Sequence, residues 1–439
     1  METTCSHFEL KMNNLKNNLH QSQQKCSTPW SWIPTLYLAE GLPYVAVVTI
    51  AGIMYKRLGI SNADITLYTG WLYLPWVIKP FWSPFVDLFK TKRQWIVAMQ
   101  LLIGAGFAGI AFTIPVSFFF QITLAFFWLL AFCSATHDIA ADGFYMLALE
   151  SDTQAKFVGI RSTFYRLATI FGQGILVILA GTLENMTKNI SLSWSITFIV
   201  LSALFFCFGI FHKFFLPKPD NDLPAANVTA KTAIKDFINT FVTFFKKRYI
   251  FRALLFLLTF RFSEAQVLAI LKLFLIDDRE KGGLGLTTDQ MGLSYGTIGI
   301  IALTIGGIIG GYAASKGGLK KWILPMTLSL LLPTAVFIYL AYSQTGNLLI
   351  INICIFIEQF GYGFGFTAYV LYMMHFADGK HKTSHYAICT GFMALGMMLP
   401  GMFSGWLQEM IGYANFFNWA MICGIVPLIA VMLLRFEKK

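Results

Sequence analysis

The sequence predicts an all-α polytopic membrane protein with twelve transmembrane helices in two pseudo-symmetric six-helix bundles. Three observations predict this fold class. The 439 residues are 56% hydrophobic and only 13% charged, with a mean hydropathy of +0.63, whereas soluble domains are roughly a quarter charged. Apolar runs of about 20 residues, the length that crosses a bilayer, recur along the whole chain. The longest polar interruption, 216–248, falls between the sixth and seventh runs.

The predicted helices follow these apolar runs, and Gly and Pro recur inside them, as is common in membrane helices. In chain order the helices are 32–55, 66–86, 95–114, 118–147, 159–181, 193–215, 250–276, 289–314, 322–342, 348–374, 384–407 and 415–435. The domains expected from this pattern are an N-terminal tail (1–29), a six-helix bundle (30–215), a linker (216–248), a second six-helix bundle (249–435) and a C-terminal tail (436–439).

The distribution of basic residues predicts the orientation. If the N-terminus is cytoplasmic, 23 Lys and Arg, Arg161 among them, fall in the inside segments and five in the outside loops. Because cytoplasmic loops retain positive charge, both termini and the linker are expected in the cytoplasm. This bias also accounts for the net charge of +11, so no nucleic-acid partner is expected.

A short motif repeats after the second and eighth predicted helices. The first copy, WSPFVDLFKTKRQW (82–95), contains Asp87, Lys92 and Arg93, and the second copy, GGYAASKGGLKKW (310–322), has Ser315 in place of the aspartate. Both copies resemble the signature loop of the major facilitator superfamily, whose plan is six helices, a linker and six more helices. The resemblance implies a conformational latch formed by Asp87, Lys92 and Arg93.

Ionisable side chains inside the predicted helices are candidates for function. Such a group costs a few kcal/mol in a bilayer unless it is paired or faces water. Those inside the helices are Glu40, Lys79, His137, Asp138, Asp142, Arg166, Arg261, Glu264, Lys272 and Glu358.

Asp138 and Asp142 are four residues apart and therefore lie one turn apart on one helix face. Two carboxylates so placed repel each other, so one is expected to hold a proton unless Lys79 or Arg166 lies between them. The proton-coupling candidates are Asp138, Asp142, Glu40 and Glu358. The alternative for Asp142 is a structural pair with Arg166.

Cations, a histidine and tyrosines supply the candidates for substrate binding. They are Lys79, His137, Arg166, Arg261, Lys272, Tyr362 and Tyr369. Each has a structural alternative: Arg261 can pair with Glu264 three residues away, Lys272 can extend its amine to the outer interface, and the tyrosines can be ordinary packing. His137 can be a proton relay or a hydrogen-bonded interior histidine.

Motifs for catalysis or cofactors are not found in the sequence. There is no phosphate-binding loop and no nucleophile elbow, and the seven cysteines form no CxxC pair. His381 and His385 have helical metal-ligand spacing, but no cysteine or carboxylate completes a set. We therefore expect no enzyme activity, no metal and no cofactor.

Five stretches of the chain resemble the AmpG-type permease family: EGLPY (40–44), LPWVIKPFWSPFVDLF (74–89), AFCSATHDIAADGF (131–144), FYRLATIFGQG (164–174) and GYGFGFTAYVL (361–371). The resemblance implies proton-coupled import of anhydromuropeptides across the bacterial inner membrane by a monomer. It matches Asp138, Asp142, Lys79 and Arg166 to family positions, whereas His137 replaces the usual Gln.

Other functions remain open from the sequence. The family group also includes the acetyl-CoA transporter, so another bulky anion is an alternative cargo, as is export of amphiphilic compounds. An intramembrane acyltransferase or a muropeptide sensor belongs to a different class. The missing nucleophile motif and the two six-helix halves favour transport over that class.

Overall fold

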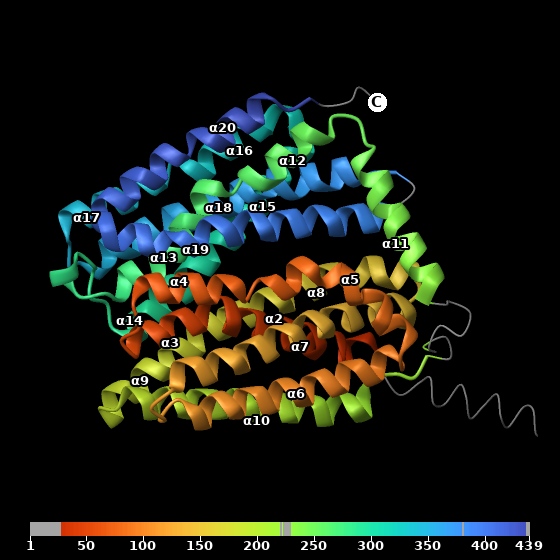
Figure 1. Cartoon of the computed structure of the whole chain (residues 1–439), viewed down its shortest axis with the longest axis horizontal. Helices are drawn as coiled ribbons and strands as arrows, with labels where there is room; N and C mark the ends of the chain where they lie inside the picture. The colour runs from red at the N-terminus through yellow and green to blue at the C-terminus, as the bar shows by residue number, and fades with distance from the viewer. Residues whose placement is uncertain (1–27, 220–221, 223–229, 380–381, 436–439) are drawn as a thin grey trace, which may run out of the picture.

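The computed structural model describes residues 28–219, 222, 230–379 and 382–435, and those residues form helices and no strand (Figure 1). The predicted C-terminal tail, nearly all of the N-terminal tail and His381 lie outside them. Ten helical stretches of the described chain are long and apolar enough to span a membrane. One, Ser384–Met432, bends at Gly412 (φ 76°), and the broken pair α4 (Asn62–Trp71) and α5 (Leu74–Leu88) adds another crossing. The arrangement is consistent with twelve spans.

The first half of the chain contains the helical segments that precede the linker. Besides α4 and α5 they are η1 (Pro29–Ser31), α2 (Ile33–Val45), η2 (Ala46–Ile50), α3 (Ala51–Arg57), α6 (Lys92–Thr113), α7 (Phe119–Ala148), α8 (Ser151–Ile170), η3 (Phe171–Leu176), α9 (Val177–Thr187) and α10 (Ile190–Phe215). Within the linker lies α11 (Ala230–Phe245).

The second half contains the remaining helical segments. They are α12 (Ile250–Thr259), α13 (Phe262–Ile276), η4 (Arg279–Lys281), α14 (Thr288–Met291), η5 (Gly292–Gly299), α15 (Ile300–Gly317), α16 (Leu319–Leu331), α17 (Thr334–Ser343), α18 (Leu348–Ala377), α19 (Lys382–Cys423) and α20 (Ile425–Met432).

Local sequence sets several helix ends. Ser61 accepts a hydrogen bond from the backbone N–H of Asp64 and caps α4, and Thr91 with Gln94 forms a capping box at the start of α6. Both satisfy N–H groups that a helix leaves unpaired. Pro75 follows the break between α4 and α5 and lies in the first turn of α5, where its missing N–H costs nothing.

The helices of each half pack mainly among themselves. In the first half α6 contacts α7 and α10, and α2 contacts α7 and α8; in the second half α18 contacts α15 and α16. Figure 1 places α6 and α10 at the lower edge and α16 and α20 at the upper edge. We call the end with α11 and the chain's C-terminus the linker end, and the opposite end, with α9, α14 and α17, the far end. The predicted domain boundaries stay a prediction.

The buried apolar residues show how the two halves meet. One cluster runs through both halves, from Ala39 to Ala420, and includes Met54 of α3 and Phe274 of α13. At the linker end the apolar core divides into a first-half cluster around Phe144 and a separate second-half cluster. The halves therefore share a continuous core toward the far end and have separate cores toward the linker end, although α5 also touches α19 and α11.

Polar contacts between the halves close the far end. Lys56 Nζ lies 2.7 Å from Asp277 Oδ2, and Tyr413 donates to the same oxygen at 2.9 Å. Asn62 donates to Gln408 at 2.6 Å and to the Tyr413 hydroxyl at 2.8 Å. This set of five residues, which we call the far-end network, joins α3 and α4 to α13 and α19.

Candidate functional site

A cavity of about 650 Å³, here called the linker-side cavity, lies between the two halves on the linker side of the molecule. Its lining comes from α2, α7, α8, α15 and α18: Glu40, Asp138, Arg161, Ser162, Tyr165, Arg166, Thr169, Leu303, Gly307, Tyr362, Gly363, Phe366, Thr367, Val370 and Leu371. Ser162 and Arg166 are exposed, and the volume lies in the range of ligand sites.

Two ion pairs lie at the first-half wall of this cavity. Lys79 Nζ of α5 lies 3.5 Å from Asp138 Oδ2 of α7, and Arg161 Nη2 of α8 lies 2.6 Å from Asp142 Oδ1. The Arg161 guanidinium also lies over the Tyr37 ring, 4.5 Å from its centroid. The turn-wise spacing of Asp138 and Asp142 on α7 lets each carboxylate meet a cation from a different helix.

Glu40 is the third carboxyl group of this wall. It is 6% exposed, it lines the cavity, and its Oε2 has no hydrogen-bond partner within the described part of the chain. The charged groups that interact electrostatically with the Glu40 carboxyl group are Asp138, Asp142, Lys79 and Arg161. Since Lys79 and Arg161 each pair with an aspartate, the cluster around Glu40 holds three carboxyl groups and two cations. Arg166 is a further cation of the cavity lining, and it lies beside Thr304 of α15.

Helix α2 brings Glu40 to this wall by packing closely against α8. A Cβ atom added at Gly41 would lie 2.8 Å from the Ala168 Cβ and 3.2 Å from the Tyr165 carbonyl oxygen. The glycine therefore permits the close approach of the two helices that sets Glu40 beside the cavity. Pro43 lies within α2 and removes one backbone donor from the helix interior.

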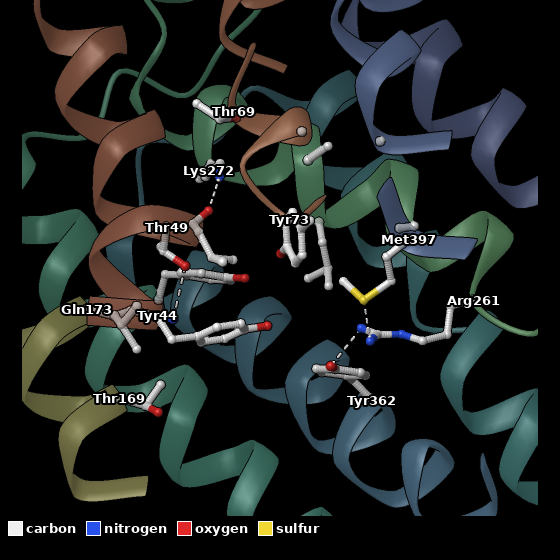
Figure 2. Close-up of a pocket in the computed structure, with 18 of the residues that line it drawn as sticks. Tyr44, Thr49, Thr69, Tyr73, Thr169, Gln173, Arg261, Lys272, Tyr362 and Met397 are labelled. Carbon is white, nitrogen blue, oxygen red and sulfur yellow. Dashed lines mark hydrogen bonds between the residues drawn. The ribbon is translucent and has the colours of Figure 1, made fainter. Parts of the chain in front are cut away.

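A second, smaller cavity lies deeper between the halves and is here called the central cavity (Figure 2). Its volume is about 240 Å³, and its lining includes Tyr44, Thr49, Thr69, Tyr73, Thr169, Gln173, Arg261, Lys272, Tyr295, Leu303, Gln359 and Tyr362. Thr169, Leu303 and Tyr362 line both cavities, so the two are neighbours that share one wall.

Arg261 lies on the second-half side of the central cavity. Its guanidinium donates to both carboxylate oxygens of Glu264, at 2.6 and 2.7 Å, and to the Tyr362 hydroxyl at 2.8 Å. The pair is buried, and the guanidinium carbon lies 5.3 Å from the Tyr362 ring centroid and 5.1 Å from that of Phe366. The predicted pair of Arg261 with Glu264 is thus present, and it holds the arginine at the cavity wall.

Lys272 lies in the same cavity and does not extend to the outer interface. The side chain is 9% exposed, and its Nζ donates to the backbone carbonyl of Val48 at 3.0 Å. Gly52 provides the space, because a Cβ atom there would lie 2.9 Å from Nζ. The structural alternative, in which Lys272 extends to the outer interface, is not what the structure shows: the side chain points toward η2 of the other half.

Arg166 does not pair with Asp142, contrary to the structural alternative drawn from the sequence. Its Nη1 lies 3.4 Å from the Thr304 hydroxyl of α15, and the residue lines the linker-side cavity. Asp142 instead pairs with Arg161, which the sequence had placed among the loop cations. Helix α8 begins at Ser151, earlier than predicted, so Arg161 lies almost three turns inside it.

His137 faces away from both cavities. Its Nε2 lies 3.0 Å from the Gln100 amide nitrogen, and Gln100 Oε1 lies 2.9 Å from His212 Nδ1. His212 Nε2 lies 3.0 Å from the Thr35 hydroxyl. These buried groups form a hydrogen-bonded chain inside the first half.

Glu358 and Tyr369 are buried in the second half without lining either cavity. Glu358 Oε2 accepts a hydrogen bond from the Gln359 amide at 2.8 Å. The Tyr369 hydroxyl donates to the Leu257 carbonyl, and its ring stacks on Phe260 with centroids 4.9 Å apart. Of the two tyrosines predicted to bind substrate, Tyr362 lines both cavities and Tyr369 packs in the core.

The predicted latch residues lie at the linker end. The backbone N–H groups of Lys92 and Arg93 donate to the Asp222 carboxylate at 2.7 and 3.1 Å, and Arg93 also donates to the Leu216 carbonyl at 3.2 Å. The Asp87 side chain lies outside the described part of the structure. The start of α6 is thereby tied to the linker that follows α10.

Several cavity residues have no counterpart among the predicted site residues. They are Arg161, Tyr44, Tyr73, Gln173 and Tyr295. Tyr44 ends the EGLPY stretch and Tyr73 lies beside the LPWVIK stretch, so the motifs that carry the resemblance could have indicated both. Tyr44 and Tyr73 meet edge to face, with ring centroids 6.5 Å apart.

Comparison with known proteins places the chain in a family. The family model described as Major Facilitator Superfamily matches residues 35–399. A Rickettsia conorii protein named as transporter AmpG 4 is 27% identical over 91% of this chain and 95% of its own length. The anhydromuropeptide permease of Escherichia coli is 23% identical over 91% of this chain and 78% of its own length.

Solved structures share the fold. An inward-facing, unoccupied bacterial homologue of the human lysosomal transporter Spinster has a TM-score of 0.69 at 14% identity, covering 92% of this chain and 96% of that one. A D-xylose–proton symporter has a TM-score of 0.68 at 13% identity, covering 92% and 97%. The chain belongs to the major facilitator superfamily of membrane transporters, and within it is similar to AmpG-type permeases.

Proposed function

We propose that this protein imports anhydromuropeptides, N-acetylglucosaminyl-anhydromuramic acid with or without a short peptide, across the bacterial inner membrane in symport with protons. The linker end is the cytoplasmic end, as the excess of basic residues in its segments indicates. The similarity to AmpG-type permeases supports the cargo, and the chemistry of the two cavities supports both cargo and coupling.

The observation that carries the proposal is the cluster of three carboxyl groups and two cations around Glu40. Lys79 and Arg161 neutralise Asp138 and Asp142, which leaves Glu40 buried with an oxygen that has no partner within the described residues. A buried carboxylate without a partner is costly. A proton on Glu40 removes that cost, so the cavity wall can take up a proton and release it where water enters.

The transport cycle follows from the way the two halves meet. In the structure the far end is closed by the far-end network, and the apolar core is divided at the linker end. Rocking of one half on the other opens the cavities to the outside and closes them to the cytoplasm. Cargo and a proton enter in the outward-open state and leave through the linker-side cavity.

The lining residues suit a bulky anionic glycopeptide. Arg166 of the linker-side cavity and Lys272 of the central cavity can donate to carboxylates. Tyr44, Tyr73 and Tyr362 offer ring faces and hydroxyls to sugars. Another bulky anion, such as acetyl-CoA, is the second candidate cargo, because the central cavity is lined by two cations and by no carboxylate among the described residues.

Uptake into proteoliposomes tests the proposal. Purified protein is reconstituted, and labelled N-acetylglucosaminyl-anhydromuramic acid is added with and without an inward proton gradient. Gradient-dependent accumulation that unlabelled anhydromuropeptide inhibits and acetyl-CoA does not inhibit is the expected result. If folded protein gives no uptake, the muropeptide assignment is wrong; if acetyl-CoA competes or accumulates instead, the second cargo replaces it.

A further inference from the structure

Lys272 is a buried cation, and no carboxylate among the described residues of its cavity balances its charge. It is 9% exposed, and its one hydrogen bond in the described structure is to the neutral Val48 carbonyl, at 3.0 Å. No Asp or Glu is among the described residues that line the central cavity. Burying an ammonium costs free energy that only an anion or several hydrogen bonds can offset.

The other cation of this cavity, Arg261, has its charge balanced inside the protein by Glu264. Arg261 is held by both oxygens of Glu264 and by the Tyr362 hydroxyl. Figure 2 shows Arg261 and Lys272 on different sides of the cavity, with Tyr73 drawn between them and a dashed line joining Lys272 to a carbonyl oxygen. Lys272 is therefore the cation left for a ligand, at the end of the cavity nearest Thr49 and Thr69.

The geometry around Lys272 keeps donors free for that ligand. An ammonium has three N–H donors, and the structure shows one of them used by Val48. Gly52 leaves the space that the Lys272 amine occupies, because a Cβ atom at this position would lie 2.8 Å from Cε and 2.9 Å from Nζ. The Thr49 hydroxyl lines the same cavity and accepts a hydrogen bond from the Gln173 amide at 3.1 Å, so its own O–H can donate to the anion.

We propose that Lys272 forms a carboxylate-binding subsite in the central cavity and reads the carboxylate of the cargo. The assignment rests on the proposed import of anhydromuropeptide and names the group of the cargo that is recognised there. The ammonium bonds the carboxylate while keeping its bond to Val48. One bound cargo thus touches α13 of the second half through an amine that is also attached to η2 of the first.

The test compares a carboxylate ligand with its neutral analogue. N-acetylglucosaminyl-anhydromuramic acid without peptide carries one carboxylate, and its primary amide has the same shape without the charge. Binding of both is measured by calorimetry with detergent-purified wild type and Lys272→Met. A charge-assisted hydrogen bond corresponds to about a 10- to 100-fold preference, so wild type should bind the acid that much more tightly, and Lys272→Met should bind both equally.

Two further variants separate this role from an effect on folding. Gly52→Ala keeps the charge but displaces the amine, and should reduce the preference for the acid at least about threefold. Lys281→Met removes a lysine that lies outside the central cavity and has a side chain 66% exposed, and should leave the ratio of acid to amide affinity unchanged.

The outcomes distinguish this subsite from the proposed cargo. The subsite is wrong, and the muropeptide assignment stands, if wild type binds the acid and the amide equally. The same conclusion follows if Lys272→Met keeps the wild-type ratio of acid to amide affinity. Wild type that binds neither compound overturns the muropeptide assignment, and the subsite with it. If Lys272→Met does not fold, the subsite is tested by the ratio of acid to amide affinity in wild type and in Gly52→Ala.

Discussion

Glu40 is the residue at which the charge balance of the cavity wall is incomplete. Its Oε2 has no partner among the described residues, whereas Asp138 and Asp142 each have a cation. Glu40→Gln keeps the size of the side chain and removes the proton site. We expect gradient-driven accumulation of cargo to fall about tenfold or more, because proton and cargo are no longer linked, while exchange of labelled for unlabelled cargo persists.

Glu358→Gln is the matched control for this substitution. Glu358 is also a buried carboxyl in a membrane helix, but it accepts a hydrogen bond from Gln359 and lines neither cavity. Both variants are assayed for accumulation across a range of external pH. Accumulation that rises with acidity in Glu40→Gln as it does in wild type would assign the proton to another carboxyl, and loss in Glu358→Gln alone would assign it there.

Which residues carry charge in the membrane could be predicted from the sequence, but their pairing could not. Arg161 and Arg166 are five residues apart on one helix, so at 3.6 residues per turn they point about 140° apart. Which of them meets Asp142 depends on the rotation of α8 about its axis, and packing sets that rotation. In the structure Gly41 of α2 lies against Ala168, and Arg161 is the arginine that meets Asp142.

At the scale of elements, α15 and α18 approach each other closely through glycines. A Cβ atom at Gly306 would lie 2.1 Å from the Phe360 carbonyl oxygen, and one at Gly363 would lie 2.0 Å from the Leu303 carbonyl oxygen. These carbonyl oxygens belong to the helix backbone, so they cannot move aside to relieve the clash as the end of a flexible side chain could. We expect Gly306→Ala to lower the free energy of unfolding by about 1 to 3 kcal/mol, seen as a lower melting temperature in detergent.

Gly311→Ala on the same helix is the control for Gly306→Ala. No atom of the described residues lies within 4 Å of a Cβ atom at Gly311, so the substitution should stabilise the helix by up to about 1 kcal/mol, the difference between Gly and Ala in a helix interior. Equal melting temperatures for the two variants would show that α15 and α18 are farther apart than in the structure.

The hydropathy of the sequence predicted that the elements are helices, but it did not predict where the helices are interrupted. The apolar runs predicted 32–55 and 159–181 as continuous helices, whereas the structure has wider π-type turns at η2 and η3 inside them. A π-type turn contains one more residue than an α-helical turn, and packing against neighbouring helices determines where that residue is accommodated. A Cβ atom at Gly296 of η5 would lie 1.9 Å from the Gln173 carbonyl of η3, a contact between halves that no local pattern contains.

At the scale of the whole molecule, the alternation of apolar runs and basic loops was enough to predict two helical halves in a membrane. It could not predict the conformational state, because both states of a rocking transporter have the same helices. The state depends on contacts between residues more than 200 positions apart, such as Lys56 with Asp277. These contacts close the far end and leave the apolar core divided at the linker end.

The far-end network therefore provides a prediction about the balance between the two states. Lys56→Met removes the cation that joins α3 to Asp277 and leaves that carboxylate with Tyr413. A contact of this kind is worth about 1 to 3 kcal/mol of coupling, so the outward-open population should rise about 5- to 150-fold relative to the closed one. Spin labels at Met186 and Glu280, exposed positions in opposite halves, report the change as a longer distance by double electron–electron resonance.

Lys281→Met tests whether the effect belongs to the contact between the halves. Lys281 Nζ also faces the Asp277 carboxylate, at 4.0 Å, but from the same half and with a side chain 66% exposed. An exposed pair within one half contributes little and does not join the halves, so its loss should leave the distance distribution as in wild type. The same lengthening in both variants would mean that the far end stays closed because the Asp277 carboxylate is neutralised, by either lysine, and not because Lys56 bonds it across the halves.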